Sequence, residues 1–320
     1  MTRVLVTGAT GFVGSTLCAM LACRGYTVRA ALRHDKAVAD SIHEKAIVGD
    51  IDGRTQWDAA LAGVESVLHL AARAHVLNDA AANASRYFET NQHGTRVLAQ
   101  AAARAGVRRL LFLSSVKVNG EGSAGKIYRA TDAPGPQDAY GTSKWRGEQA
   151  VLDEAARTGM HTMIVRPPLV YGPGVRANFL RLMRWVDGQR PLPLACVDNR
   201  RSLVSVWTLC DLLCTLLEHP ASAGTWMVSD GEDLSTPDLV RRLARAMQRR
   251  ARLLAVPVAL LRVGGGLLGK RAEVERLCGS LVVDAAPTRD KLGWSPPLSA
   301  DEALARTVSW YLSEGRFRGA

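Results

Sequence analysis

A tyrosine and a lysine four residues apart could act at one reaction site. Tyr140 and Lys144 form a Y-x-x-x-K element at the start of a helical run, and positions i and i+4 share one face of a helix. A free phenol titrates near pH ~10, and a neighbouring ammonium favours the phenolate. The tyrosine could then exchange a proton near neutral pH. Alone, the pair is also compatible with two surface side chains, so its meaning depends on the elements around it.

Three glycines near the start of the chain could hold phosphate. The apolar run 4–6 leads into a loop that reads Thr7-Gly8-Ala9-Thr10-Gly11-Phe12-Val13-Gly14, and a helical pattern follows. A helix beginning after such a loop points its free N–H groups and positive dipole end at phosphate. Gly8 permits the turn, Gly11 admits a pyrophosphate, and Gly14 lets the helix approach the strand. We therefore expect a nicotinamide dinucleotide on residues 8 and 10–14.

The end of the second strand bears on the choice between NAD and NADP. An acidic residue there binds the ribose hydroxyls of NAD, whereas a basic residue suits the 2′-phosphate of NADP. Residues 28–34 contain no acid, and Arg33 stands where a guanidinium could bind phosphate bidentately. This favours NADP. NAD remains the alternative if Arg33 is only a surface residue.

The elements that must position these residues alternate along the first half of the chain. Hydrophobic periodicity predicts strands over 4–6, 27–32, 45–48, 66–70, 109–114 and 162–165, and helices over 16–24, 58–61, 87–105 and 140–158. Such alternation predicts an α/β fold, a Rossmann-type doubly wound parallel sheet. We expect a dinucleotide-binding domain over 1–166. Frequent prolines after Arg166 predict a smaller, mainly substrate-binding region over 167–320, with less regular elements and some segments returning to the sheet.

These motifs together resemble the extended short-chain dehydrogenase/reductase superfamily. The loop matches its T-G-A-T-G-F-x-G pattern, residues 114–120 resemble S-S-x-x-V-x-G, and residues 166–174 resemble R-x-x-x-V-Y-G-P-G. The resemblance implies a catalytic trio of Ser115, Tyr140 and Lys144, with Ser115 hydrogen-bonding the reacting sugar oxygen. It also implies that Tyr140 and Lys144 contact the cofactor.

Further contacts are implied by the same resemblance. On the cofactor side, these are the pair Asp50-Ile51 around adenine, the small residues Leu70-Ala71-Ala72, the supporting Asn91, and Pro167 beside the nicotinamide. On the substrate side, Asn178, Arg201 and Arg276 would meet the diphosphate of a sugar nucleotide, since arginine matches phosphate geometry. Lys117 could reach the substrate or be solvated, and both readings stay open.

The resemblance implies chemistry at carbon 4 of a UDP-sugar. Reduction of a 4-keto sugar for surface-polysaccharide synthesis is the favoured reading, because NADP suits net reduction. A UDP-glucose or UDP-N-acetylglucosamine 4-epimerase with tightly bound NAD is the alternative. A non-catalytic NADP-binding sensor or scaffold is the alternative of another class.

Composition narrows the possible partners. The net charge is +11, but arginine doublets never extend into a long basic run, so we expect no nucleic-acid partner. The longest apolar stretch, about 256–268, is interrupted by proline, arginine and glycines and is too short to span a bilayer, so we expect no membrane partner. Six cysteines lack metal-ligand spacing, and no metal site is predicted. We expect a cytoplasmic enzyme, with a homodimer possible from the family.

Overall fold

A parallel sheet forms the centre of the molecule. The computed structural model describes residues 2–74, 84–123 and 125–317. Seven strands lie in the order β10-β7-β5-β4-β1-β2-β3, and every neighbouring pair is parallel. Their bounds are β1 Arg3–Thr7, β2 Thr27–Leu32, β3 Glu44–Ile47, β4 Ser66–His69, β5 Arg109–Leu113, β7 His161–Arg166 and β10 Gly224–Met227. The strand order reverses between β1 and β4, which is the doubly wound arrangement that the sequence predicts.

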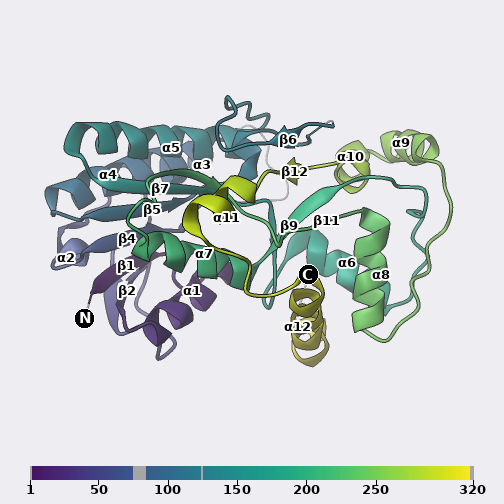
Figure 1. The fold of residues 1–320 in the computed structure, drawn as a ribbon, viewed down its shortest axis with the longest axis horizontal. Helices are drawn as coiled ribbons and strands as arrows, with labels where there is room; N and C mark the ends of the chain where they lie inside the picture. Colours follow the sequence, from purple (N-terminus) through teal and green to yellow (C-terminus); the bar gives the residue numbers. More distant parts are fainter. Residues whose placement is uncertain (1, 75–83, 124, 318–320) are drawn as a thin grey trace.

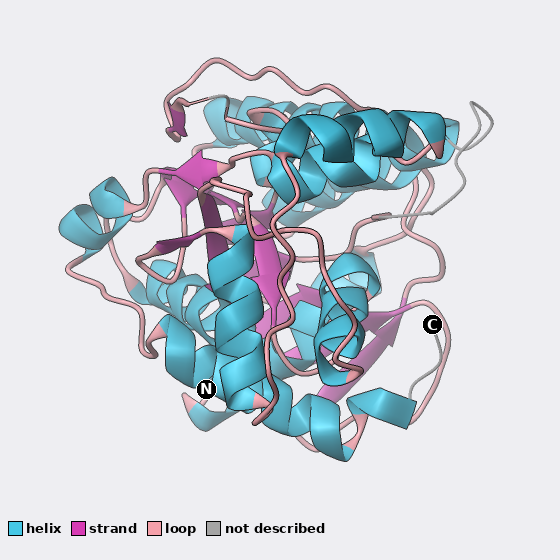
Figure 2. Cartoon of the chain, turned by 90° about the vertical axis from the view of Figure 1, so that its right-hand side faces the viewer, coloured by secondary structure: helices cyan, strands magenta, loops and turns pink. Residues whose placement is uncertain are grey.

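Helices cover both faces of this sheet (Figure 1). On one face α1 (Phe12–Cys23) packs beside α7 (Val206–Glu218), and on the other α4 (Thr95–Arg104) packs beside α5 (Ala139–Thr158). Each layer closes an apolar core over the strands. Figure 2, turned by 90°, shows the strands between these helices. The short α2 (Asp58–Leu61) has the bounds that the sequence predicts.

The helix predicted over 87–105 consists of three segments. α3 (Ala84–Phe88) leads into a π-helical turn, η2 (Glu89–Gly94), and α4 follows. A π-turn adds a residue to one helical turn and often marks a functional position. Periodicity of the sequence predicts the helix but not this insertion.

Most of the rest of the chain builds a second, smaller layer beside the sheet, whereas α11 (Ala286–Leu292) packs on the core of the seven-stranded sheet. The second layer includes the three-stranded sheet β11-β9-β8 and the pair β12-β6. The bounds are β6 Ile127–Tyr128, β8 Leu169–Tyr171, β9 Arg201–Ser205, β11 Asp233–Leu234, β12 Val282–Val283, α6 Ala177–Asp187, α8 Thr236–Ala246, α9 Val258–Leu267, α10 Arg271–Cys278, α11 Ala286–Leu292 and α12 Ala300–Ser313, with 3-10 turns η3 Val116–Val118 and η4 Gly315–Phe317. The prediction of irregular elements after Arg166 is wrong for α7 and α12, which are regular helices of 13 and 14 residues.

Gly147 allows α5 to lie unusually close to its neighbours. A Cβ atom there would sit 2.5 Å from the Asn91 carbonyl oxygen and 2.9 Å from the ring of Phe112. Neither group can move easily, because one is backbone and the other is fully buried. Close packing at this point holds the helix that carries Tyr140 against η2 and β5.

We predict that Gly147→Ala lowers the free energy of unfolding by about 1–3 kcal/mol, the usual cost of overpacking. Urea denaturation measures this. The control is Gly266→Ala, in α9, where an added Cβ meets open space and alanine favours the helix. A Gly147→Ala variant as stable as wild type would contradict the packing argument.

Candidate active site

Loops that follow four neighbouring strands bring the predicted site residues to one edge of the sheet. Gly8 follows β1, Leu70 follows β4, Ser115 lies just after β5, and Pro167 follows β7. The carboxyl edge at the point where strand order reverses is where α/β sheets bind ligands. The Val116 N–H donates to the Pro167 carbonyl at 3.0 Å, which joins two of these loops.

The glycine loop fits a dinucleotide pyrophosphate. Gly8 has φ +70°, and a Cβ on it would lie 2.8 Å from the Ala71 nitrogen; a Cβ on Gly14 would lie 2.1 Å from the Gly8 oxygen. Only glycine fits either position. Gly11 is the N-cap of α1 and has no side chain to bind the N–H groups of the first turn. Those N–H groups could bind phosphate oxygens. Thr10, Phe12 and Val13 belong to the same turn.

Two exposed charges meet where the adenosine end of the cofactor is predicted. Arg33 Nε lies 2.5 Å from Asp50 Oδ1. Arg33 is therefore paired with a carboxylate, which the sequence-based argument for NADP does not include. Nearby, Lys36 Nζ donates to Thr10 Oγ1 at 2.8 Å. Ile51 packs against Gly94, where a Cβ would come within 2.7 Å of its side chain.

A buried histidine braces the strand ends beneath the loop. His69 Nδ1 lies 2.7 Å from Thr7 Oγ1, and its Nε2 lies 2.9 Å from Thr95 Oγ1. Burial, with a smaller contribution from the Lys144 charge, lowers the pKa of His69 to about 3. The ring is therefore neutral, and it can bond both hydroxyls by donating to one and accepting from the other. Thr7 Oγ1 also accepts from the Ala71 N–H at 3.0 Å, which fixes the strand end that includes Leu70, Ala71 and Ala72.

Tyr140 is held in the first turn of α5. Asp138 is the N-cap of that helix and accepts from the Gly141 N–H at 2.6 Å. The Tyr140 hydroxyl is hydrogen-bonded to Ser115. Burial raises the pKa of Tyr140 to about 12, although the bond to Ser115 acts in the opposite direction. The protein's own groups therefore keep the phenol protonated. The sequence-based argument expected Lys144 to lower the Tyr140 pKa, and these groups do not lower it.

Lys144 is fully buried one turn further along α5. Its Nζ donates to the Leu113 carbonyl at 2.6 Å and lies 4.0 Å from the centre of the Phe112 ring. Burial lowers its pKa to about 7, and the Glu148 carboxylate only partly offsets this. An ammonium has three N–H donors, so Lys144 keeps donors for a further ligand such as the ribose of a dinucleotide.

Asn91 joins the loop after β4 to the catalytic helix. It lies in η2, and its Oδ1 accepts from the Arg73 N–H at 2.9 Å while its Nδ2 donates to the Arg73 carbonyl at 3.0 Å. The same Nδ2 lies 2.9 Å from Ser143 Oγ on α5. Asn91 thus links two segments of the protein, and its support of the cofactor stays a prediction. Arg73 itself was missed by sequence reasoning, and so was Tyr87, whose ring lies edge-on to Tyr140 with centroids 6.1 Å apart.

A buried ion pair lies directly behind the trio. Arg166 donates to both oxygens of Glu148, at 2.9 and 2.6 Å, and also to Asn119 Oδ1 at 3.2 Å. Ser114 Oγ donates to the same carboxylate. The cluster connects β7 to α5 and to the loop of Ser115. Glu148 is four residues after Lys144, so helical spacing could have placed it on the same face; its arginine partner could not be predicted from spacing.

Lys117 is held by carboxylates. Its Nζ lies 2.6 Å from Glu121 Oε1 and 2.6 Å from Asp138 Oδ2, and 6.0 Å from the centre of the Tyr140 ring. Burial disfavours the charged form, yet the hydrogen bonds to Asp138 and Glu121 raise the pKa of Lys117 above its ordinary value. Lys117 is therefore neither freely solvated nor free to leave this pair without cost.

The predicted substrate residues come from three elements. Arg201, in β9, donates to the carbonyls of Arg276 at 2.7 Å and Gly279 at 3.0 Å, and burial lowers its pKa. The two predicted diphosphate arginines are thus neighbours. Asn178, in α6, is exposed and accepts from Arg181 Nη2 at 2.9 Å. Contact of these three residues with a substrate stays a prediction.

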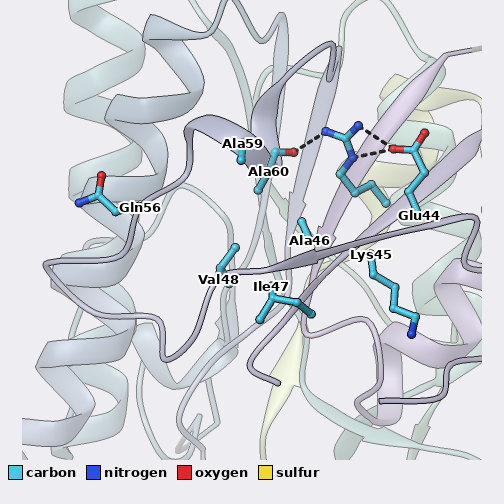
Figure 3. Close-up of a pocket in the computed structure, with 9 residues that line it drawn as sticks. Glu44, Lys45, Ala46, Ile47, Val48, Gln56, Ala59 and Ala60 are labelled. Carbon is cyan, nitrogen blue, oxygen red and sulfur yellow. Dashed lines mark hydrogen bonds and ion pairs between the residues drawn. The ribbon is translucent and has the colours of Figure 1, made fainter. Parts of the chain in front are cut away.

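A hollow of about 470 Å³ lies elsewhere, on the outer edge of the sheet between β3 and α2 (Figure 3). Arg29 there donates to Glu44 Oε2 at 2.6 Å and to the Ala60 carbonyl at 2.9 Å. Its charge is already compensated by these groups. The hollow includes none of the catalytic trio, so we do not assign the reaction to it.

The chain is similar to known proteins over most of its length. A model of the NAD dependent epimerase/dehydratase family matches residues 4–228. The chain is 41% identical over 314 residues to a UDP-glucose 4-epimerase of Vibrio cholerae, covering 97% of this chain and 95% of that protein. It is 26% identical to an N-acetyl-alpha-D-glucosaminyl-diphospho-ditrans,octacis-undecaprenol 4-epimerase of Escherichia coli O157:H7, with coverage of 96% and 95%.

Solved structures agree on the fold. MoeE5 in complex with UDP-glucuronic acid and NAD is 25% identical with a TM-score of 0.78, covering 97% of this chain and 99% of that one. A UDP-glucuronic acid 4-epimerase from Bacillus cereus in complex with NAD has the same TM-score at 20% identity, with coverage of 97% and 98%.

Fold and site together define an enzyme that uses a nicotinamide dinucleotide. The chain belongs to the NAD-dependent epimerase/dehydratase family, within the extended short-chain dehydrogenase/reductases. The resemblance read from the sequence is thereby confirmed.

The low pKa of Lys144 predicts a pH dependence of stability. Between about pH 7 and its ordinary value of 10.5, the unfolded chain holds a proton at this residue that the folded chain lacks. The free energy of unfolding therefore rises with pH across this window. The excess stability of wild type over Lys144→Met should grow from pH 7 to pH 9.5, by at most about 1.4 kcal/mol per pH unit.

Urea titrations at several pH values measure this difference. Lys126→Met, at an exposed lysine, is the control and should show no such growth. A difference between wild type and Lys144→Met that stays flat or falls would show that Lys144 is not held uncharged.

Proposed function

We propose that this protein is a UDP-sugar 4-epimerase that uses NAD, with UDP-glucose as the first substrate to test. The similarity to the Vibrio cholerae UDP-glucose 4-epimerase over nearly the full length of both chains carries the proposal. The hydrogen bond between Tyr140 and Ser115, with the buried Lys144 one helical turn away, supports it, because a sensor or scaffold has no need for these groups in one place.

The trio suits removal and return of a hydrogen at one carbon. When bound, the dinucleotide supplies a hydride acceptor that can give the hydride back. Tyr140 takes the proton of the sugar hydroxyl and later returns it, and Ser115 orients both oxygens. Since burial and the nearby Asp138 carboxylate hold the Tyr140 pKa high, the phenol needs nearby positive charge to act as a base. Lys144 lies one helical turn away on α5, and with a pKa of about 7 it carries a positive charge only in part near neutral pH.

The similarity to the Vibrio cholerae UDP-glucose 4-epimerase favours epimerisation over net reduction. The same three residues would serve 4-keto reduction, which the sequence-based preference for NADP favoured. That preference rested on Arg33, which is paired with Asp50. A carboxylate at this point can accept from ribose hydroxyls and repels a 2′-phosphate, and three of the structures similar to this chain contain NAD. NAD is therefore the cofactor that we propose.

Purified wild-type protein should interconvert UDP-glucose and UDP-galactose without added NADPH. Tyr140→Phe should lower kcat by about 10²–10⁴-fold, the usual contribution of general acid–base catalysis, with little change in the urea midpoint. Tyr26→Phe, at a hydroxyl bonded to Glu218 away from the trio, is the matched control and should keep full activity. An active Tyr140→Phe enzyme would remove the catalytic assignment, and turnover of 4-keto sugars only with NADPH would favour the reductase.

The pairing of Arg33 with Asp50 predicts cofactor choice. Wild type should bind NADH more tightly than NADPH, and Asp50→Asn should shift the ratio of dissociation constants toward NADPH by about tenfold, since one repulsive charge beside a phosphate is typically worth ~1 kcal/mol or more. Quenching of nucleotide fluorescence measures both constants. Asp52→Asn, two residues along the same loop, is the control. Tighter binding of NADPH by wild type would restore the sequence-based preference.

A further inference from the structure

One helix in the second layer is apolar on two opposite faces. In α9, Val258 and Leu261 pack against the apolar core, and a Cβ on Gly265 would lie 2.5 Å from the Val274 side chain. Leu260, Val263 and Leu267 lie on the other side and are 61%, 61% and 85% exposed. They recur at helical spacing, so they form one continuous outward stripe. Leu268, at the C-cap of α9, is 74% exposed and extends the apolar surface at that end.

Basic residues border this stripe. Lys270 and Arg271 follow Leu268 after one intervening residue, Gly269, and are exposed. The two carboxylates of α10 are already engaged, since Glu273 lies 3.5 Å from Arg181 and Glu275 lies 3.2 Å from Arg262. Over residues 2–74, 84–123 and 125–317, neither Lys270 nor Arg271 has an ion-pair partner. The rim is therefore positively charged next to an exposed leucine surface.

We propose that the outward stripe of α9, with Lys270 and Arg271, docks the enzyme on an anionic lipid surface. Leucines beside lysine and arginine are the combination by which helices lie in the membrane interface, with the apolar side chains inserted and the cations on the headgroups. No helix in the described ranges is long and apolar enough to cross a bilayer, so the contact is peripheral. This departs from the sequence-based expectation of no membrane partner.

Charge and size argue for lipid over a second copy of the chain. Two such faces packed in parallel would bring the rim cations of one copy against those of the other, which opposes association. α9 has only ten residues and is about 15 Å long, which is small for the roughly 1,200–2,000 Å² that stable interfaces bury. Insertion of a few leucines into lipid needs no such area.

The position of the stripe suits docking. α9 lies at the periphery, away from the seven-stranded sheet (Figure 1), and packs on α10. The carbonyl of Arg276, in α10, accepts from Arg201. Docking through α9 would thus place the predicted diphosphate side of the site close to the lipid. The docking itself does not depend on the proposed epimerase activity.

Co-sedimentation of the full-length protein with vesicles tests the proposal. Wild type should sediment with vesicles of phosphatidylcholine that contain one third phosphatidylglycerol. The fraction of protein that sediments with pure phosphatidylcholine vesicles should be at least fivefold lower. Leu267→Glu, and separately Lys270→Gln combined with Arg271→Gln, should each lower the bound fraction at least fivefold. Ile127→Glu, at an exposed isoleucine of β6, is the matched control and should bind as wild type does. Unchanged urea midpoints show that the variants fold.

Three results would overturn the proposal. Wild type could fail to sediment with the anionic vesicles, Leu267→Glu could bind as well as wild type, or sedimentation could be equal on both kinds of vesicle. A lipid-independent dimer that Leu267→Glu converts to a monomer would assign the stripe to a second copy instead. Loss of UDP-sugar turnover in any of these proteins would bear on the proposed function. It would not affect the interpretation of lipid binding, which co-sedimentation measures separately.

Discussion

Burial of the Lys144 ammonium, one helical turn from Tyr140 on α5, is the constraint on which the rest of the site depends. A charge removed from water is costly unless polar groups compensate it. Here the Leu113 carbonyl and the face of Phe112 do so only in part, so the pKa of Lys144 falls to about 7. Burial moves the Tyr140 pKa in the other direction, to about 12. The protein's own groups therefore keep the Tyr140 phenol protonated and make the Lys144 ammonium easier to deprotonate.

Several buried polar contacts keep these two side chains in place. Asn91 joins α5 to the loop of Arg73, and the bidentate Glu148–Arg166 pair joins α5 to β7. Removing one partner of such a pair leaves a buried charge, at a cost of about 3–5 kcal/mol. The close approach at Gly147 adds a steric constraint. Contacts of α5 with η2, β5 and β7 therefore fix the positions of Tyr140 and Lys144 relative to the glycine loop.

The features that could be predicted from the sequence are those that depend on residues close together in the chain. The glycine loop, the Y-x-x-x-K pair and the alternating strands each depend on neighbours within about ten residues, and Thr27–Leu32 and Asp58–Leu61 fall where periodicity places them. The features that were missed depend on residues far apart. Arg33 reads as a phosphate ligand until folding brings Asp50 to it, and Arg166 lies 18 residues from Glu148. The π-turn that carries Asn91 and the outward leucines of α9 likewise require the packed chain, because periodicity does not tell which apolar face is covered.

Retention of the hydrogen at carbon 4 tests the central claim most directly. Wild-type protein is incubated with UDP-glucose deuterated at carbon 4, with no dinucleotide added, and the UDP-galactose formed is examined by mass spectrometry and NMR. The account predicts that the product keeps the deuterium at carbon 4, because the same hydrogen leaves and returns within one active site. Product without deuterium, or product formed only while added NADPH is consumed, would contradict it.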